Sequence, residues 1–492
     1  MIVVFLLLQL RQFCFETTVT MVFNSIPFLL FFVVVFFVYW VLLKKSTKAQ
    51  NVFLLVASYF FYGYANWRML PLLVVSTVVF YFLGKGIGRA KTEKMASWLR
   101  VFGVVLGVGL LFYFKYLGFF VNAFFSLSLR IIMPLGVSFF TFRLMSYVMD
   151  VYNGEVEPTE NIVDFAVYIS FFPCILSGPI DRPKFIGQLQ RKREFHYDQA
   201  VDGMRQILWG LFKKIVVADN CSVYVDQVFS TYADQSGSTL LLAAICCSFQ
   251  VYADFSGYSD MAIGVGKLLG FSISRNFDCP FFALNVADFW RRWHMSLTTW
   301  MTDYVFTPLN FRFRHWGKTG IILAVVINMV LVGMWHGADW TFALFGLYHG
   351  LLFIPLILSG AFMKKAKLRT NGLGLPVLAD LGRMLLTFAL VVFGVIIFRS
   401  ESIGQAWAYV CGMGDKSLLA VPWLINRQFY IPLFANMALL IIVEWINRSK
   451  SHPLDLSSVR SHAVKYMIYF VIITLIIFFT PPTPSPFVYF QF

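Results

Sequence analysis

The sequence predicts an all-α integral membrane protein with about 11–13 membrane helices, re-entrant segments included. Hydrophobic residues make up 59% of the chain and charged residues only 13%, whereas soluble domains carry about 25% charged residues. Several windows of about twenty residues hold few charges, and this is the length that crosses a hydrocarbon core. The windows are continuously apolar rather than alternating, so they indicate helices and not the strands of a transmembrane barrel.

The first twenty residues differ from the rest of the chain. Residues 1–20 begin with an apolar run that is too short to span a membrane. The run lacks the basic start and small-residue cleavage site of a signal peptide. We therefore expect residues 1–20 to be an N-terminal extension, with Met21 as the natural start. A processed signal peptide is the alternative.

A single transmembrane domain is expected over residues 21–480. The apolar runs that predict its spans lie at about 26–43, 51–66, 69–83, 101–124, 131–150, 162–179, 206–229, 239–262, 319–335, 340–359, 380–398, 428–446 and 464–480. The run 162–179 is interrupted by Pro173, Gly178 and Pro179, so it cannot be one regular helix.

Basic residues cluster in short loops between the apolar runs, as orientation signals do. This pattern explains the net charge of +15 without a nucleic-acid partner, and we find no DNA-binding motif. If the basic loops are cytoplasmic, the segment 162–179 must enter and leave the membrane on the same side. Such re-entrant backbone needs protein or a water-filled cavity around it. The same count puts both termini outside the cytoplasm.

Residues 285–306 do not resemble a membrane span. Their aromatic and leucine side chains fall near one helical face, which predicts an amphipathic helix at the cytoplasmic interface: Phe289, Trp293, Leu297 and Trp300. Arg291 and Arg292 suit an anionic, phosphate-bearing donor, and with Trp293 they are the candidate donor-binding residues. His294 is a candidate catalytic residue, with an interfacial anchor as the alternative.

His336 is the strongest candidate for catalysis. It lies between two apolar runs, next to Trp335 and Gly337. An ionisable residue at membrane depth is a functional-site hypothesis by default. The alternative is a histidine that hydrogen-bonds across helices, and we expect that role for His349.

The segment 250–260 is unusually polar for a membrane span. Asp254 and Tyr258 are candidates to line a tunnel, as are Trp335 and Asp339, although they could equally form a packing network. The seven cysteines have no CxxC spacing, and no pattern of histidines and carboxylates suggests a metal site.

The C-terminal segment 481–492 is proline-rich and ends in aromatic residues. An extended chain of about 3.1 Å per residue could carry Tyr489 back towards the middle of the membrane. The alternative is an aromatic anchor at the interface.

Five motifs together resemble the membrane-bound O-acyltransferase family, in its bacterial branch of alginate O-acetyltransferases with D-alanyl transferases as relatives. They are Pro134-Leu-Gly-Val-Ser-Phe-Phe-Thr-Phe142, Phe172-Pro…Gly178-Pro-Ile180, Asp254-Phe-Ser-Gly-Tyr-Ser-Asp260, Asp288-Phe-Trp-Arg-Arg-Trp-His-Met-Ser-Leu297 and Gly333-Met-Trp-His-Gly-Ala338. The resemblance implies a ring of helices around a tunnel. It also implies His336 as the central catalytic histidine, His294 as the second, and Tyr489 as a transient acyl acceptor.

Two motifs depart from that branch, Trp300-Met-Thr-Asp-Tyr304 and Pro308-Leu-Asn-Phe311, and they put contacts near the cytoplasmic mouth in doubt.

These observations predict a multi-pass acyltransferase of the bacterial inner membrane. We expect it to move an acetyl group from acetyl-CoA, without a permanently bound cofactor, for O-acetylation of an extracytoplasmic polysaccharide such as alginate. The resemblance also implies an extracytoplasmic SGNH-type acetyltransferase as partner. Transfer of D-alanine from a carrier protein and a polytopic transporter are the alternatives.

Overall fold

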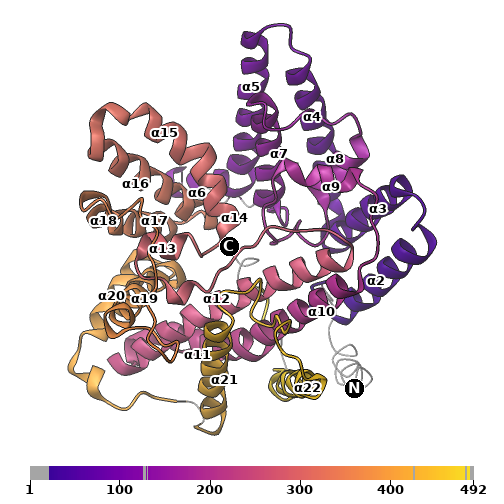
Figure 1. Cartoon of the computed structure of the whole chain (residues 1–492). Helices are drawn as coiled ribbons and strands as arrows, with labels where there is room; N and C mark the ends of the chain where they lie inside the picture. The colour runs from indigo at the N-terminus through magenta and orange to yellow at the C-terminus, as the bar shows by residue number, and fades with distance from the viewer. Residues whose placement is uncertain (1–20, 126–128, 130, 425–426, 482–484, 488–492) are drawn as a thin grey trace. The chain divides into compact units, whose positions relative to one another are not determined.

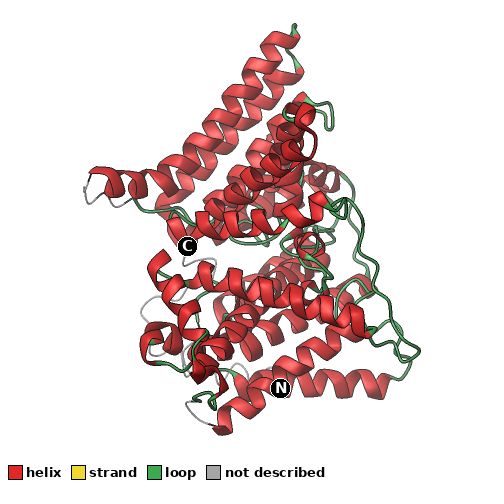
Figure 2. Ribbon diagram, turned by 90° about the vertical axis from the view of Figure 1, so that its left-hand side faces the viewer, coloured by secondary structure: helices red, strands yellow, loops and turns green. Residues whose placement is uncertain are grey.

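The computed structural model describes residues 21–125, 129, 131–424, 427–481 and 485–487. Helices joined by loops make up this part, and no strand occurs in it (Figure 2). The predicted all-α class is therefore confirmed. The expected N-terminal extension, residues 1–20, lies outside the described residues.

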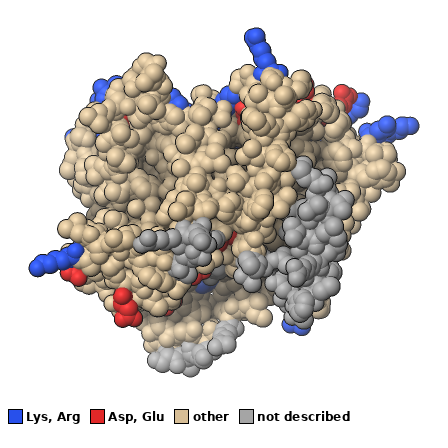
Figure 3. Space-filling view, turned by 90° about the horizontal axis from the view of Figure 1, so that it is seen from below, with Lys and Arg blue, Asp and Glu red and all other residues tan. Residues whose placement is uncertain are grey.

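Seven helices in the described part are long and apolar enough to cross a membrane: Thr47–Gly88, Glu93–Phe125, Gly237–Leu268, Arg314–His336, Trp340–Leu358, Leu378–Arg399 and His462–Phe479. Two shorter apolar helices, Ile26–Leu42 and Tyr430–Ile446, add to them. The first of the seven contains two of the predicted spans. The surface drawn in Figure 3 is correspondingly poor in charged side chains.

Three predicted spans, 131–150, 162–179 and 206–229, are shorter or more polar than these seven helices. The first corresponds to α7 (Val137–Tyr152), which buries the charged Arg143 and Asp150. The second begins as α8 (Ile162–Ser170) and then leaves the helical conformation. Whether the chain has as many as 11–13 membrane segments stays a prediction.

The chain divides into two compact units. The first comprises residues 1–207 and 260–274, and the second comprises 208–259 and 275–492. The helix α12 (Gly237–Leu268) contributes to both. The prediction of one transmembrane domain over residues 21–480 stays a prediction.

In the first unit, α7 packs against α4 (Leu70–Gly88) and α5 (Glu93–Leu111), and the three form a bundle (Figure 1). The buried Arg143 of α7 donates to the carbonyl oxygens of Tyr168 and Pro179, at 3.1 and 2.8 Å. The irregular backbone at 171–181 is buried along its whole length. Protein therefore surrounds this broken segment, and its entry and exit on one side of the membrane stay a prediction.

The second unit contains a tight helical hairpin of α16 (Gly317–His336) and α17 (Trp340–Leu352). Glycines let the two backbones touch. A Cβ on Gly346 would lie 2.7 Å from the Cα of Val330, and one on Gly333 would lie 2.8 Å from the Gly346 nitrogen. Small residues at such an interface allow close helix packing within a membrane. α19 (Leu378–Arg399) covers α17.

The predicted amphipathic helix over 285–306 is broken. α13 (Val286–Trp290) and α14 (Met295–Met301) are separated by a turn. Within the turn, His294 adopts a φ of 44°, in the left-handed region that no α-helix residue occupies. The four residues expected on the apolar face are all buried in protein: Phe289, Trp293, Leu297 and Trp300. The expectation of one interfacial helix was therefore wrong.

Candidate functional site

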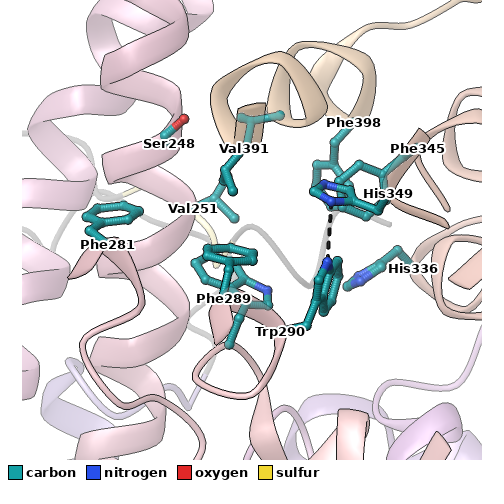
Figure 4. Close-up of a pocket in the computed structure, with 12 residues that line it drawn as sticks. Ser248, Val251, Phe281, Phe289, Trp290, His336, Phe345, His349, Val391 and Phe398 are labelled. Carbon is teal, nitrogen blue, oxygen red and sulfur yellow. Dashed lines mark hydrogen bonds between the residues drawn. The ribbon is translucent and has the colours of Figure 1, made fainter. Parts of the chain in front are cut away.

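A small cavity in the second unit brings two of the histidines together (Figure 4). Its volume is about 30 Å³, which is room for only a few atoms. Twelve residues from α12, α13, α16, α17, α19 and the segments beside them line it: Ser248, Val251, Phe281, Phe289, Trp290, Trp293, His336, Phe345, His349, Val391, Val395 and Phe398.

His336 is the last residue of α16, and its side chain lines the cavity. The hairpin turn that follows His336 depends on Gly337. Because Gly337 has no Cβ, the ring of Phe342 can pack directly against it. The rings of Phe345 and Phe398 stand edge-on to the imidazole, with centroids 6.1 and 5.2 Å away.

His294 lies on the other side of Trp335. The Trp335 ring is 5.4 Å from the His294 ring and 5.0 Å from the His336 ring, centroid to centroid. His294 is fully buried, and its ring meets Phe255 of α12 edge-on at 4.6 Å. Burial lowers the pKa of His294 well below its usual value, and charge on His336 lowers it further. Two of the predicted catalytic residues are thus neighbours across one tryptophan.

The turn that presents His294 is held by Asn276, which lies in a loop before α13. The Asn276 carbonyl accepts from the Met295 nitrogen at 2.8 Å, and its side-chain oxygen accepts from the Ser296 hydroxyl at 2.7 Å. Its amide then donates to Ser259 of α12 at 3.0 Å. Asn276 therefore holds the two residues that follow His294 and ties them to α12.

His349 joins the same cavity from α17. The indole nitrogen of Trp290 donates to its Nδ1 at 3.3 Å, and this bond is the dashed line in Figure 4. On the same turn, Trp293 stacks on Phe289 at 5.3 Å and lines the cavity. His349 has the interhelical bond that was expected of it, and it also faces the candidate site.

The two candidate donor-binding arginines hold neighbouring loops. Arg291 donates to the carbonyl oxygens of Phe362 and Lys364, at 2.5 and 3.1 Å. Arg292 pairs with Asp288 at 3.0 Å. Only Trp293 of the three predicted donor-binding residues lines the cavity, and a donor role for the three stays a prediction.

The other predicted tunnel-lining residues lie outside the cavity. Asp339 caps α17 by accepting from the Thr341 nitrogen at 2.9 Å. Asp254 is paired with Lys214, and the Tyr258 ring contacts Phe487. Trp335 separates the two histidines. Tyr489 lies outside the described residues, so its role as an acyl acceptor stays a prediction.

Sequence reasoning missed Trp290, Asn276 and the buried Lys214. Trp290 and Asn276 carry no signal of their own, because their partners are distant in the sequence. Lys214 did carry one, since a lysine within an apolar run is expected to be functional or paired.

The profile of the membrane-bound O-acyltransferase family matches residues 59–387 of this chain, a range that includes His294 and His336. A protein of Pseudomonas syringae named as a probable alginate O-acetylase is 34% identical over 81% of this chain and 76% of its own length. A peptidoglycan O-acetyltransferase of Helicobacter pylori is 30% identical over 88% of this chain and 90% of its own length. A teichoic acid D-alanyltransferase of Bacillus subtilis is 30% identical over 54% of this chain and 69% of its own length.

Proposed function

This chain belongs to the membrane-bound O-acyltransferase family, and we propose that it transfers acetyl groups for the O-acetylation of an extracytoplasmic polysaccharide. It is a multi-pass membrane protein and an acyltransferase. The observation that carries the proposal is the pair His294 and His336, which flank Trp335 beside a small aromatic cavity. The relatives named for alginate and peptidoglycan acetylation support a polysaccharide acceptor.

In the proposed reaction His336 acts as general base. It takes the proton from an attacking hydroxyl, whose oxygen forms an ester bond with the acetyl carbonyl carbon. The carbon–sulfur bond of the acetyl-CoA donor breaks, and the thiolate takes up the proton to leave as a free thiol. A base within hydrogen-bond reach contributes typically about 10²–10⁴-fold to such a step. Tyr489 is the proposed first acceptor, which passes the acetyl group on through a second, equivalent transfer.

The cavity favours an acetyl group over D-alanine. Its twelve lining residues include no carboxylate, and nine of them are valine, phenylalanine or tryptophan. A D-alanyl group carries an ammonium, which is costly to bury without an anionic partner. A neutral acetyl group fits both the size and the polarity of the cavity.

We place the protein in the bacterial inner membrane, with acetyl-CoA arriving from the cytoplasm near Trp293. An extracytoplasmic SGNH-type acetyltransferase would then carry the acetyl group to sugar hydroxyls. A polytopic transporter is the rival class. It has no need of a general base, so substitution of His336 separates the two functions.

The test replaces His336 with alanine in cells that depend on this chain for envelope O-acetylation. We expect the His336→Ala variant to lower the O-acetyl content of the polysaccharide to the level of a deletion strain. The matched control is His315→Ala, because His315 is exposed and lies outside the cavity. The proposal fails if the His336→Ala protein accumulates normally and sustains wild-type acetylation.

A further inference from the structure

A buried ion cluster in the second unit plays no part in the mechanism proposed above. Lys214 has its ammonium nitrogen 2.9 Å from Asp219 and 2.6 Å from Asp254. All three side chains are no more than 2% exposed. Burying three charged groups is costly unless each is well paired. We therefore looked for a function of this cluster in the residues that contact it.

The local fold brings the three residues together. Lys214 belongs to the π-helix η5 (Phe212–Ala218), and Asp219 begins α11 (Asp219–Ser230). π-helical turns join residues five apart, as these two are. Asp254 comes from α12. Gly257 lets α12 approach η5 closely, because a Cβ at this position would lie 3.2 Å from the backbone nitrogen of Lys214.

The cluster also holds the C-terminal tail. Lys214 donates to the carbonyl oxygen of Ser485 at 3.0 Å. An ammonium group has three N–H donors, and the tail carbonyl is the third oxygen beside the two carboxylates. The Ser485 hydroxyl lies 2.6 Å from that of Ser222. Because Ser222 donates to the Asp219 carbonyl, Ser485 is the donor of this second bond.

Phe487 completes the attachment. Its side chain is 2% exposed, and its ring lies 4.2 Å from the Lys214 ammonium and 4.9 Å from the Tyr258 ring. A cation over an aromatic face is attracted by the ring, most strongly where water is excluded. Asp254 and Tyr258 are four residues apart on α12, so they present one face to the tail.

We propose that Lys214, Asp254, Ser222 and Tyr258 form a socket that positions the chain's own C-terminal tail for acyl transfer. Phe255, between Asp254 and Tyr258 in sequence, contacts the catalytic candidate His294. Tyr489, the proposed acyl acceptor, follows Phe487 by two residues in the sequence. The positioning role rests on the proposed function, whereas the attachment itself does not.

Attachment is tested by a disulfide between Ser222→Cys and Ser485→Cys in the full-length chain. The two hydroxyl oxygens are close enough for sulfur atoms to bond with little movement. Cys14 and the exposed Cys411 are first replaced by serine; the other five cysteines are buried.

We expect mild oxidation to protect both new thiols from a maleimide mass tag. The control pair Ser457→Cys with Ser485→Cys should stay labelled. Equal labelling of the two pairs would overturn the socket.

Positioning is tested by Phe487→Ala, which removes the ring and leaves the three buried charged residues unchanged. We expect at least a tenfold lower turnover number with an unchanged KM for acetyl-CoA, because donor binding does not need the tail. Lys214→Met should have the same effect, with Lys214→Arg restoring part of the activity. The control Phe478→Ala removes an exposed ring at the end of α22 (His462–Phe479) and should change neither constant.

The outcomes separate the two proposals. A disulfide that forms in a chain whose Phe487→Ala variant is fully active would refute the positioning role. Failure of the His336→Ala test would refute the proposed function, yet it would leave the disulfide result unchanged.

Discussion

At the scale of single residues, the buried His294 should make the protein sensitive to mild acid. Its folded pKa is lowered, first by burial and then by His336. The unfolded chain therefore takes up a proton near the ordinary histidine pKa of about 6.5, before the folded chain does. Stability should be fully present above this pH and decline as the pH falls below it.

Thermal unfolding in detergent between pH 8 and 5.5 measures this effect. We expect His294→Gln to flatten the decline, because the proton uptake of the unfolded state is then lost at that position. The exposed His315 is the matched control, and His315→Gln should leave the pH dependence unchanged. An unaltered slope in the His294→Gln protein would contradict the argument.

Val391 tests whether the cavity selects the acyl group by size. It is buried on α19 and lines the cavity (Figure 4). Val391→Ala should raise the rate with propionyl-CoA relative to acetyl-CoA by about tenfold, since one methylene in an apolar pocket is worth roughly that factor or more. Competition between the two thioesters measures the ratio. Val105→Ala, an exposed valine on α5, should not change it.

Residue-scale prediction succeeded where the residue type is unusual for its surroundings. His336 and His294 stood out because apolar sequence surrounds them, and the structure brings both beside Trp335. Arg291 and Arg292 stood out for the same reason, but their partners include loop carbonyls that no local pattern could identify. Composition identifies an ionisable residue without identifying its partner.

At the scale of helices, most predicted spans coincide with observed ones because long apolar runs and their polar breaks are local signals. The break at His294 was not predictable in this way. It depends on Asn276 and on Ser259 of α12, which lie 18 and 35 positions earlier in the chain. A tertiary contact therefore overrides the helical periodicity of the segment.

The α16–α17 hairpin depends on glycine at its contact points. Gly346→Ala adds a methyl group that must push against the backbone at Met329 and Val330. Overpacking of this kind costs typically about 1–3 kcal/mol, and here it would also displace His336 and His349. We expect a lower unfolding temperature and reduced acetylation.

The matched change on a neighbouring helix is Gly382→Ala in α19, where a Cβ meets no other atom within 4 Å. An added Cβ in an open helix position stabilises by about 0.5–1 kcal/mol. Gly382→Ala should therefore be neutral or slightly stabilising, with unchanged activity. Equal effects of the two substitutions would show that glycine packing does not set the hairpin.

At the scale of the whole molecule, composition was enough to predict a helical membrane protein, and the all-α structure confirms the class. Composition was not enough to assign every helix to the membrane. The segment 197–230 contains Lys213, Lys214 and Asp219, all buried, so it is more polar than a span in contact with lipid. A helix surrounded by protein is free of the hydropathy requirement on which span prediction relies.

The orientation deduced from the basic loops concerns the chain as a whole. It puts the loop 360–376 in the cytoplasm and the loop 414–424 outside, because α19 crosses between them. Leu373 and Leu419 are 85% and 94% exposed, so a cysteine at either position can be labelled without disturbing the core. With Cys14 and the exposed Cys411 replaced by serine, a membrane-impermeant maleimide should label Leu419→Cys in intact cells and spare Leu373→Cys until the cells are opened. Labelling of Leu373→Cys alone would reverse the orientation and would move the C-terminal tail to the wrong side for handing an acyl group to an extracytoplasmic partner.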